Sequence, residues 1–202
     1  MKKVGLYFGT FNPIHVGHLI IANYMAEQTE LDEVWLVVSP QNPLKQKSSL
    51  LADYHRLALA RIGIENNPKL RVSDIEFSLP KPSFTAATLA YLTEKYENMV
   101  FALIMGEDNL RTFHKWKNYE VILENHELFV YPRALTVQEE KELQLHKTEL
   151  KLGDHPNIHF VDAPVMKLSA SFIRNAIKNG KDVKYLLTEP VHKYLKEMHF
   201  YE

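Results

Sequence analysis

Three absences narrow what this 202-residue sequence can do. It contains no cysteine, which excludes disulfide bonds, thiolate nucleophiles and cysteine-ligated zinc. No apolar run reaches the roughly 20 residues of a membrane-spanning helix, and the first residues lack the apolar core and cleavage site of a signal peptide. With 24 basic and 25 acidic residues, no charge excess attracts nucleic acid or an anionic membrane. We therefore expect a cytoplasmic protein that binds neither, and whose affinity for phosphate depends on a few local groups.

Strands and helices alternate along the chain, with no internal repeat or low-complexity linker. Apolar runs predict strands over residues 4–8, 33–39, 70–77 (with a bulge or bend at Ser73-Asp74), 99–105, 126–131 and 157–163. Helices are expected over residues 17–29, 51–66, from a cap at Ser83 or Thr85 up to 96, and over 118–124, 136–151 and 169–178. A final short helix is expected within 185–198, with Pro190 near its first turn. This alternation predicts a single α/β domain over 1–202, doubly wound around a mainly parallel sheet, with 165–202 as a small helical extension.

The stretch from Val4 to His18 (VGLYFGTFNPIHVGH) predicts a strand, a tight turn and the start of a helix. Pro13 cannot continue a strand ladder and suits a helix start. Such a junction aims free backbone N–H groups and the positive end of a helix dipole at one point, which suits a phosphate. His15 and His18 lie three residues apart, so they share one face of a first helical turn. An imidazole there can donate a hydrogen bond to a phosphate oxygen. The alternative is a plain junction with two surface histidines.

Residues 9–18 (GTFNPIHVGH) resemble the GxFxPxHxGH signature of the nucleotidyltransferase superfamily with HxGH motifs. Within it, the chain most resembles the bacterial nicotinate-mononucleotide adenylyltransferases, because four separated segments match in family order over nearly the whole chain. The resemblance implies a Rossmann-like nucleotidyltransferase fold. It also implies ATP contacts from Gly9, Thr10, Phe11, His15 and His18. Asn12 stands where many relatives have aspartate, so we expect it near the substrate but not as a base.

The segment 106–116 (GEDNLRTFHKW) follows the clearest central strand and resembles the family's GxDxLxxFxxW motif. The resemblance implies that Gly106 and Asp108 contact ATP and that Trp116 stacks on the pyridine ring of the mononucleotide. An indole face suits an electron-poor ring. The alternatives are a strand-ending glycine, an aspartate that caps a helix, and a tryptophan buried for packing.

The segment 168–174 (LSASFIR) opens the helix after the last strand and resembles the family's ISSTxIR motif, which binds the ATP phosphates. The resemblance assigns ATP contacts to Ser169, Ser171, Ile173 and Arg174. An arginine can hold phosphate oxygens in a bidentate way, so Arg174 joins the two histidines as a candidate catalytic residue. The alternative is a serine-capped helix with a solvated arginine.

The resemblance also indicates substrate-binding residues. The string SFTAATL around Thr85 resembles SYTxDTL, which implies that Thr85 and its neighbouring backbone contact the nicotinate end, although the usual aspartate is Ala87. The string NPLK matches the family's NPPHK loop imperfectly, so either Lys45 or Lys47 would lie beside the phosphates. Arg133, after the strand at 126–131, is a candidate partner of the mononucleotide phosphate.

The reaction implied by the resemblance is adenylyl transfer from ATP to nicotinate mononucleotide, with Mg²⁺ held mainly by ATP oxygens and no metal site of the protein's own. His18 is the first candidate for the transition state and His15 for the phosphates. Nicotinamide mononucleotide and phosphopantetheine are alternative acceptors. A silent nucleotide sensor is the other alternative, supported only by the changes at Asn12, Ala87, Ala170 and the lysine loop. The oligomeric state stays open, a homo-oligomer included.

Overall fold

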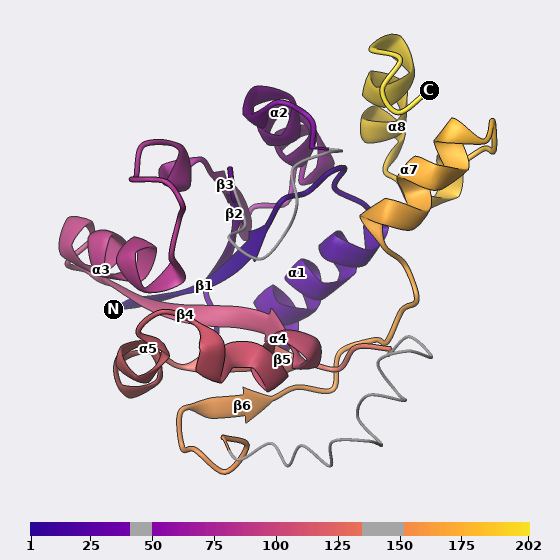
Figure 1. The fold of residues 1–202 in the computed structure, drawn as a ribbon. Helices are drawn as coiled ribbons and strands as arrows, with labels where there is room; N and C mark the ends of the chain where they lie inside the picture. The colour runs from indigo at the N-terminus through magenta and orange to yellow at the C-terminus, as the bar shows by residue number, and fades with distance from the viewer. Residues whose placement is uncertain (41–49, 135–151) are drawn as a thin grey trace.

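A computed structural model describes residues 1–40, 50–134 and 152–202 of the chain. These residues form a six-stranded sheet in the order β3-β2-β1-β4-β5-β6, in which every pairing is parallel (Figure 1). Its strands are β1 (Lys2–Gly9), β2 (Glu33–Val38), β3 (Leu70–Ser73), β4 (Met99–Gly106), β5 (Leu128–Tyr131) and β6 (Ile158–Phe160). The prediction of a doubly wound α/β fold is confirmed, and the sheet is wholly rather than mainly parallel.

The order of the strands explains where a ligand can bind. The chain builds outward from β1 through β2 to β3, then crosses back to place β4 on the other side of β1. Connections therefore leave the carboxyl ends of β1 and β4 in opposite directions, which opens a crevice between them. The register sets Tyr7 opposite Ile104 and Gly9 opposite Val38, so the ends of the three central strands lie level with one another.

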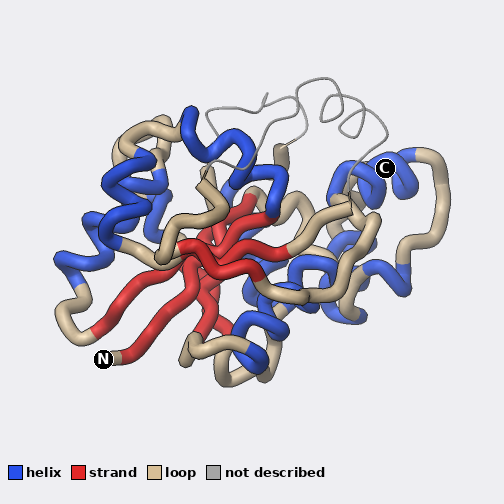
Figure 2. Tube along the Cα trace, turned by 90° about the horizontal axis from the view of Figure 1, so that it is seen from below, coloured by secondary structure: helices blue, strands red, loops and turns tan. Residues whose placement is uncertain are grey.

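Helices cover both faces of the sheet (Figure 2). One face packs on α1 (Val16–Gln28) and α2 (Asp53–Gly63), joined by the pair α7 (Ala170–Lys178) and α8 (Glu189–Glu197). The other packs on α3 (Thr85–Lys95), α4 (Glu107–Thr112) and α5 (Tyr119–Asn125). Because side chains alternate along a strand, the central strands supply both cores, for example Ile104 to the first and Leu103 to the second.

The apolar alternation from Leu70 to Phe77 predicts an extended segment with a bulge or bend at Ser73-Asp74. In the structure, the extended part of this segment stops at that bend. The strand ends at Ser73, and Ile75–Phe77 form a single 3₁₀ turn closed by a bond from the Phe77 N–H to the Asp74 carbonyl, at 2.8 Å. The bend is held from within, because it buries the Glu76 carboxyl, which accepts a hydrogen bond from the Thr88 hydroxyl at 2.9 Å. The pattern located the bend but not its cause.

Helix boundaries differ from expectation where a backbone group has a tertiary partner. Leu51 is not helical, because its N–H donates to Asn12 Oδ1 at 3.2 Å and its carbonyl accepts from Arg56 Nε at 3.0 Å. Neither serine nor threonine caps α3: Phe84 is its N-cap residue, with no side-chain capping bond. Gly180 follows the end of α7 with a φ of 64°, as expected of a C′ glycine.

The last strand is shorter than the sequence predicted, covering Ile158–Phe160 rather than 157–163. The final short helix begins at Glu189 with Pro190 in its first turn, as predicted, and follows a separate 3₁₀ turn over Lys184–Leu186. A further 3₁₀ turn over Phe113–Lys115 links α4 to α5. The predicted helix at 136–151 lies outside the described residues.

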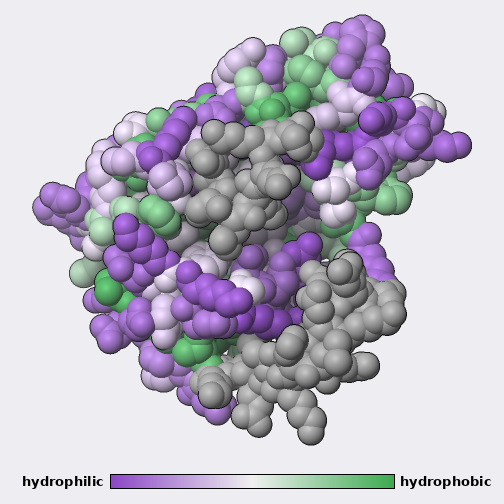
Figure 3. Space-filling model, viewed as in Figure 1, coloured by the Kyte–Doolittle hydropathy of each residue, from purple (hydrophilic) through white to green (hydrophobic). Residues whose placement is uncertain are grey.

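The face of the molecule in Figure 3 is largely hydrophilic, with a small apolar patch near α2 and α8. Across the ranges 1–40, 50–134 and 152–202, no helix is both long and apolar enough to cross a membrane.

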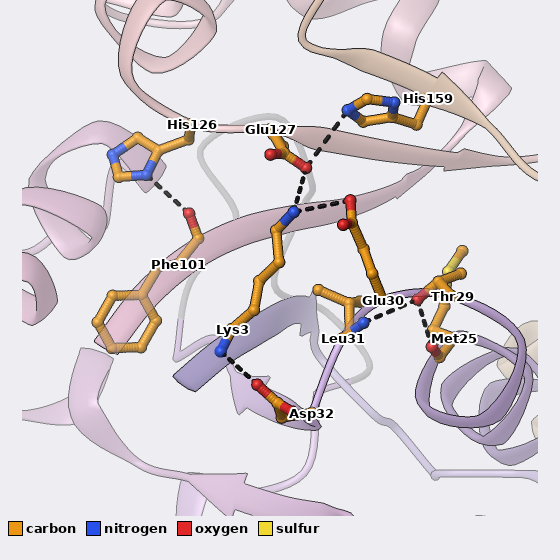
Figure 4. A network of polar contacts seen from close by, with 10 residues as sticks. All are labelled: Lys3, Met25, Thr29, Glu30, Leu31, Asp32, Phe101, His126, Glu127 and His159. Carbon is orange, nitrogen blue, oxygen red and sulfur yellow. Dashed lines mark hydrogen bonds and ion pairs between the residues drawn. The ribbon is translucent and has the colours of Figure 1, made fainter. Parts of the chain in front are cut away.

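A polar network ties the strands together at the end of the sheet opposite the crevice (Figure 4). Lys3 Nζ lies 2.7 Å from Glu30 and 2.6 Å from Glu127, and Glu127 also lies 3.3 Å from His159 Nε2. The Lys3 backbone N–H donates to Asp32 at 2.7 Å. These contacts join β1 to the α1–β2 connection and to the starts of β5 and β6, so one lysine links the middle of the sheet to its edge.

We expect Lys3→Met to lower the free energy of unfolding by about 1 kcal/mol, because the substitution keeps the apolar stem but leaves two carboxylates without their shared cation. Chemical denaturation at low salt measures this, and the loss should shrink in high salt. Lys193→Met is the matched control, because its pair with Glu197 is exposed and lies along one helix. A Lys3 variant as stable as the Lys193 variant would show that the network contributes nothing.

Candidate active site

A cleft opens at the carboxyl ends of β1, β4 and β5, between the first turns of α1 and α7. Predicted site residues from four separate segments line it together: Gly9, Thr10, Phe11, Asn12, His15, His18, Gly106, Trp116, Arg133, Ser169, Ser171 and Arg174. The segments meet because parallel strands end at one edge of the sheet and each runs into a helix or loop there. Residues up to 165 positions apart in sequence thus face one space.

The loop after β1 is held in an unusual backbone shape. Phe11 has a φ of 45°, in the left-handed region that side chains with a Cβ rarely adopt. Its ring is buried against Gly9, where an added Cβ would lie 2.9 Å from the ring. Glycine at position 9 is therefore needed for the ring to tuck beneath the loop, and Phe11 can present only its backbone to a ligand.

The two histidines form a stacked pair at the start of α1. Their ring centroids lie 3.8 Å apart with the planes 25° from parallel. His15 is the N-cap residue, and its backbone N–H donates to His18 Nδ1 at 3.3 Å. Because Nδ1 accepts this bond, a neutral His18 carries its proton on Nε2.

His15 lies deeper than His18 and only 5% of it is exposed. Burial lowers the pKa of His15 from 6.5 to about 4, so the ring is neutral at pH 7. Its Nδ1 has no hydrogen-bond partner within the described part of the chain. Gly17 leaves room for the ring, since a Cβ there would lie 3.0 Å from it. The site thus holds one sequestered neutral imidazole and one imidazole at the cleft surface.

This burial predicts a pH effect on stability. The unfolded chain protonates His15 near pH 6.5, whereas the folded protein resists protonation until about pH 4. The contribution of His15 to the free energy of unfolding is therefore constant above pH 6.5. It is lost as the pH falls from 6.5 toward 4, by about 3 kcal/mol in full. We expect His15→Asn to lose less stability than the wild type between pH 7 and pH 4.5, measured by urea denaturation. His114→Asn, a change at an exposed histidine, should lose as much as the wild type.

The start of α7 presents two hydroxyls and one guanidinium to the cleft. Ser169 caps the helix by accepting a bond from the Phe172 N–H at 3.2 Å. Arg174 donates to Ser171 Oγ at 3.1 Å and to the Asn12 carbonyl at 2.8 Å. Arg174 is therefore not a solvated side chain but a link between the loop after β1 and the first turn of α7. Ile173 is fully buried in the core and does not line the cleft.

The ends of β4 and β5 form the opposite wall. Asp108 pairs with Arg133, and a Cβ at Gly106 would lie 2.5 Å from Asp108 Oδ1. That oxygen is buried and has no partner among the residues that the structure describes. Asp108 itself is not among the residues that line the cleft. Trp116 is half-buried at the cleft, edge-on to Phe113 with centroids 5.4 Å apart, so it is part packing residue and part wall.

One predicted substrate contact does not line this cleft, and two lie outside the described residues. Thr85 begins α3 and does not line the cleft as the structure stands. Lys45 and Lys47 lie outside the described residues.

Sequence reasoning missed several polar residues at the site. The hydroxyls of Tyr7 and Tyr131 lie 3.2 Å apart on the cleft wall, and burial raises the pKa of both, so both stay protonated at neutral pH. Arg56 is fully buried behind the loop, and Tyr201 donates to Asn12 Oδ1 at 2.6 Å. Arg56 had a signal, because it falls on the apolar face of α2 with Leu59. Tyr201 had none, because its partner lies 189 residues away.

Comparison with known proteins identifies the family of this chain. A sequence profile of the cytidylyltransferase-like family matches residues 6–176. A chain from Flavobacterium johnsoniae, named a probable nicotinate-nucleotide adenylyltransferase, is 54% identical over 99% of both chains. One of the same name from Bacteroides fragilis is 42% identical over 95% of this chain and 90% of its own.

Solved structures support the fold. A Plasmodium falciparum nicotinic acid mononucleotide adenylyltransferase complexed with NaAD superposes with a TM-score of 0.78 at 20% identity, over 100% of this chain and 98% of its own. A putatively assigned nicotinate-nucleotide adenylyltransferase from Vibrio parahaemolyticus superposes with a TM-score of 0.70 at 22% identity, over 100% and 96%. Full-length identity to the curated relatives, with the HxGH loop at the crevice of the sheet, shows that this chain is a nucleotidyltransferase and belongs to the nicotinate-nucleotide adenylyltransferase family.

Proposed function

We propose that this protein transfers the adenylyl group of ATP to nicotinate mononucleotide, giving nicotinate adenine dinucleotide and pyrophosphate in NAD biosynthesis. The observation that carries the proposal is the meeting of His18, Arg174 and the first turns of α1 and α7 at one cleft. These groups offer hydrogen-bond donors and positive helix ends to a polyphosphate. Family membership at 54% identity supports the same reaction.

The chemistry needs positioning more than proton transfer. A phosphate oxygen of the mononucleotide attacks the α-phosphorus of ATP, the bond from that phosphorus to the bridging oxygen breaks, and pyrophosphate leaves with the electron pair. The attacking phosphate is already an anion at neutral pH, so no general base is required. Catalysis then depends on alignment and on donors that meet the charge growing on the phosphoryl oxygens.

Each donor has a distinct part in this proposal. His18 donates from Nε2 to the α-phosphate, because its Nδ1 is engaged by the His15 N–H. Arg174, held by the Asn12 carbonyl and Ser171, directs its remaining N–H groups at the leaving phosphates. His15, neutral and buried, supports the ring of His18 by stacking and meets the ATP phosphates at the edge of the cleft.

The acceptor would lie across the cleft from these groups. We assign stacking on the pyridine ring to Trp116 and the mononucleotide phosphate to Arg133, with Lys45 or Lys47 beside the phosphates. Thr85 lies outside the cleft as described, at the start of a helix with no side-chain cap, and we assign it to the nicotinate carboxylate on the family resemblance. Nicotinate carries that carboxylate and nicotinamide does not, which favours nicotinate.

Mg²⁺ enters this proposal as part of its ATP complex, where it would neutralise phosphate charge. The polar side chains that line the described cleft are mainly imidazole, guanidinium and hydroxyl groups, which bind anions rather than Mg²⁺. Over the described ranges, no group of three or more histidine, aspartate or glutamate side chains is placed to hold a metal. No step above depends on a metal held by the protein.

Pyrophosphate release by the purified protein tests the proposal, with ATP and Mg²⁺ and each of three acceptors in parallel. We expect pyrophosphate release to be much faster with nicotinate mononucleotide than with nicotinamide mononucleotide. We expect no release with phosphopantetheine. Equal use of both mononucleotides would contradict the assigned selectivity. Release with phosphopantetheine alone would replace the acceptor. Tight ATP binding without pyrophosphate release, whichever acceptor is present, would favour the silent nucleotide sensor.

A further inference from the structure

We propose that Tyr201 is a positioning residue for adenylyl transfer, which acts through Asn12 on the loop that carries the two histidines. The expected effect on kcat rests on the proposed function. The expected effect on the rigidity of the loop rests on the geometry alone. Tyr201 follows α8 and lies far from the signature in sequence, yet its hydroxyl donates to Asn12 Oδ1 at 2.6 Å. No motif of the chain includes this residue.

Asn12 is where three distant segments converge. Its Oδ1 accepts from the Tyr201 hydroxyl and from the Leu51 N–H, and its carbonyl accepts from Arg174 at 2.8 Å. The residue is 3% exposed, so these bonds are sheltered from water. A shift of Asn12 would therefore move Arg174 on one side and, three residues on, the N-cap His15 on the other.

The loop needs such support because its backbone is strained. Phe11, with its φ of 45°, lies in the left-handed region, which is unfavourable for a residue that carries a Cβ. Hydrogen bonds hold the carbonyls on either side of it: Arg56 donates to Thr10 at 2.7 Å, and Arg174 donates to Asn12. Tyr201 adds a second, shorter bond to Asn12 Oδ1 beside the one from the Leu51 N–H, and this bond opposes relaxation of the loop by rotation of the Asn12 side chain.

The turn that carries Tyr201 is itself anchored to the rest of the protein. The turn after α8 is anchored by a bond from the Phe200 N–H to the Leu195 carbonyl at 3.1 Å, and the Phe200 ring packs on His55 with centroids 4.6 Å apart. Burial raises the pKa of Tyr201 well above 10, although Arg174 and Arg56 oppose this rise. The hydroxyl therefore stays protonated and remains a donor to Asn12 throughout the neutral range.

The test compares Tyr201→Phe with Tyr194→Phe. Both remove one hydroxyl from the C-terminal part of the chain, but that of Tyr194 lies 3.2 Å from His55 Nδ1 and does not touch the loop. We expect Tyr201→Phe to lower kcat about tenfold, the equivalent of one buried hydrogen bond, with a smaller change in KM for ATP. Tyr194→Phe should keep the wild-type kcat, with a similar shift in Tm.

A double-mutant cycle separates positioning from general stabilisation. If Tyr201 acts through Asn12, Tyr201→Phe should have no further effect on kcat in an Asn12→Ala background. The same tenfold loss in both backgrounds, or an unchanged kcat for Tyr201→Phe alone, would overturn the inference.

Hydrogen exchange supplies a readout that does not depend on activity. Tyr201→Phe should speed amide exchange across residues 10–18 at least severalfold, and Tyr194→Phe should not. Unchanged exchange there would refute the positioning role even in an inactive protein. Absence of pyrophosphate release from the wild type, with faster exchange in the variant, would instead refute the proposed function and leave this inference standing.

Discussion

Replacing His18 with alanine is expected to lower kcat by 10²–10³-fold while ATP affinity changes less than about fivefold. The reason is the position of His18 at the cleft, with Nδ1 engaged by the His15 N–H so that Nε2 carries the donated proton. Such a donor matters most when charge grows on the α-phosphate, so its loss affects the transition state more than the ground state. Steady-state kinetics and calorimetric titration with a non-hydrolysable ATP analogue measure the two quantities.

His18→Gln is the matched control for that variant. Its side-chain amide can place an N–H near the position of Nε2, so we expect it to recover part of the turnover that alanine loses. Both variants remove the Nδ1 acceptor of the His15 N–H, and so they share the local structural cost. Equal kcat values for alanine and glutamine, or a loss confined to ATP affinity, would show that His18 binds the nucleotide without serving the transition state.

The sequence predicted those parts of the site that lie within short continuous stretches of the chain. The run from Val4 to His18 predicts a strand, a turn and a helix start, and the structure has β1 ending at Gly9 and α1 beginning at Val16. Apolar runs likewise predicted the central strands, because residues buried on both faces leave a continuous signal. The convergence of these segments follows from the parallel topology alone.

What could not be predicted depends on pairs of residues far apart in the chain. Tyr201 and Asn12 carry no local pattern that would join them, and neither do Lys3 and Glu127 at the other end of the sheet. The stacking of His15 on His18, and the burial that lowers the pKa of His15, depend on the packing of the finished crevice. Local periodicity reports which face of an element is buried but not which polar group meets it there.

Arg56 is the second residue whose replacement should have a large effect, and that effect should be on stability. We expect Arg56→Met to lower the free energy of unfolding by about 3–5 kcal/mol. The guanidinium is fully buried and donates to the carbonyls of Thr10, Ser39 and Leu51, at 2.7, 2.9 and 3.0 Å, as well as to Asp53. A methionine fills similar space but leaves three partly buried carbonyls without this donor, and each carries a desolvation cost.

Arg56→Lys tests whether charge or geometry matters. A lysine keeps the positive charge, but a single ammonium group cannot follow the planar fork that serves carbonyls at the ends of β1 and β2 together. We therefore expect it to recover less than half of the lost stability, as measured by urea denaturation. Arg61→Met on the same helix, which removes an exposed guanidinium paired with Asp74, should be close to neutral. Full recovery by lysine would mean that charge alone suffices, and that the hydrogen bonds to the loop after β1 do not hold it in place.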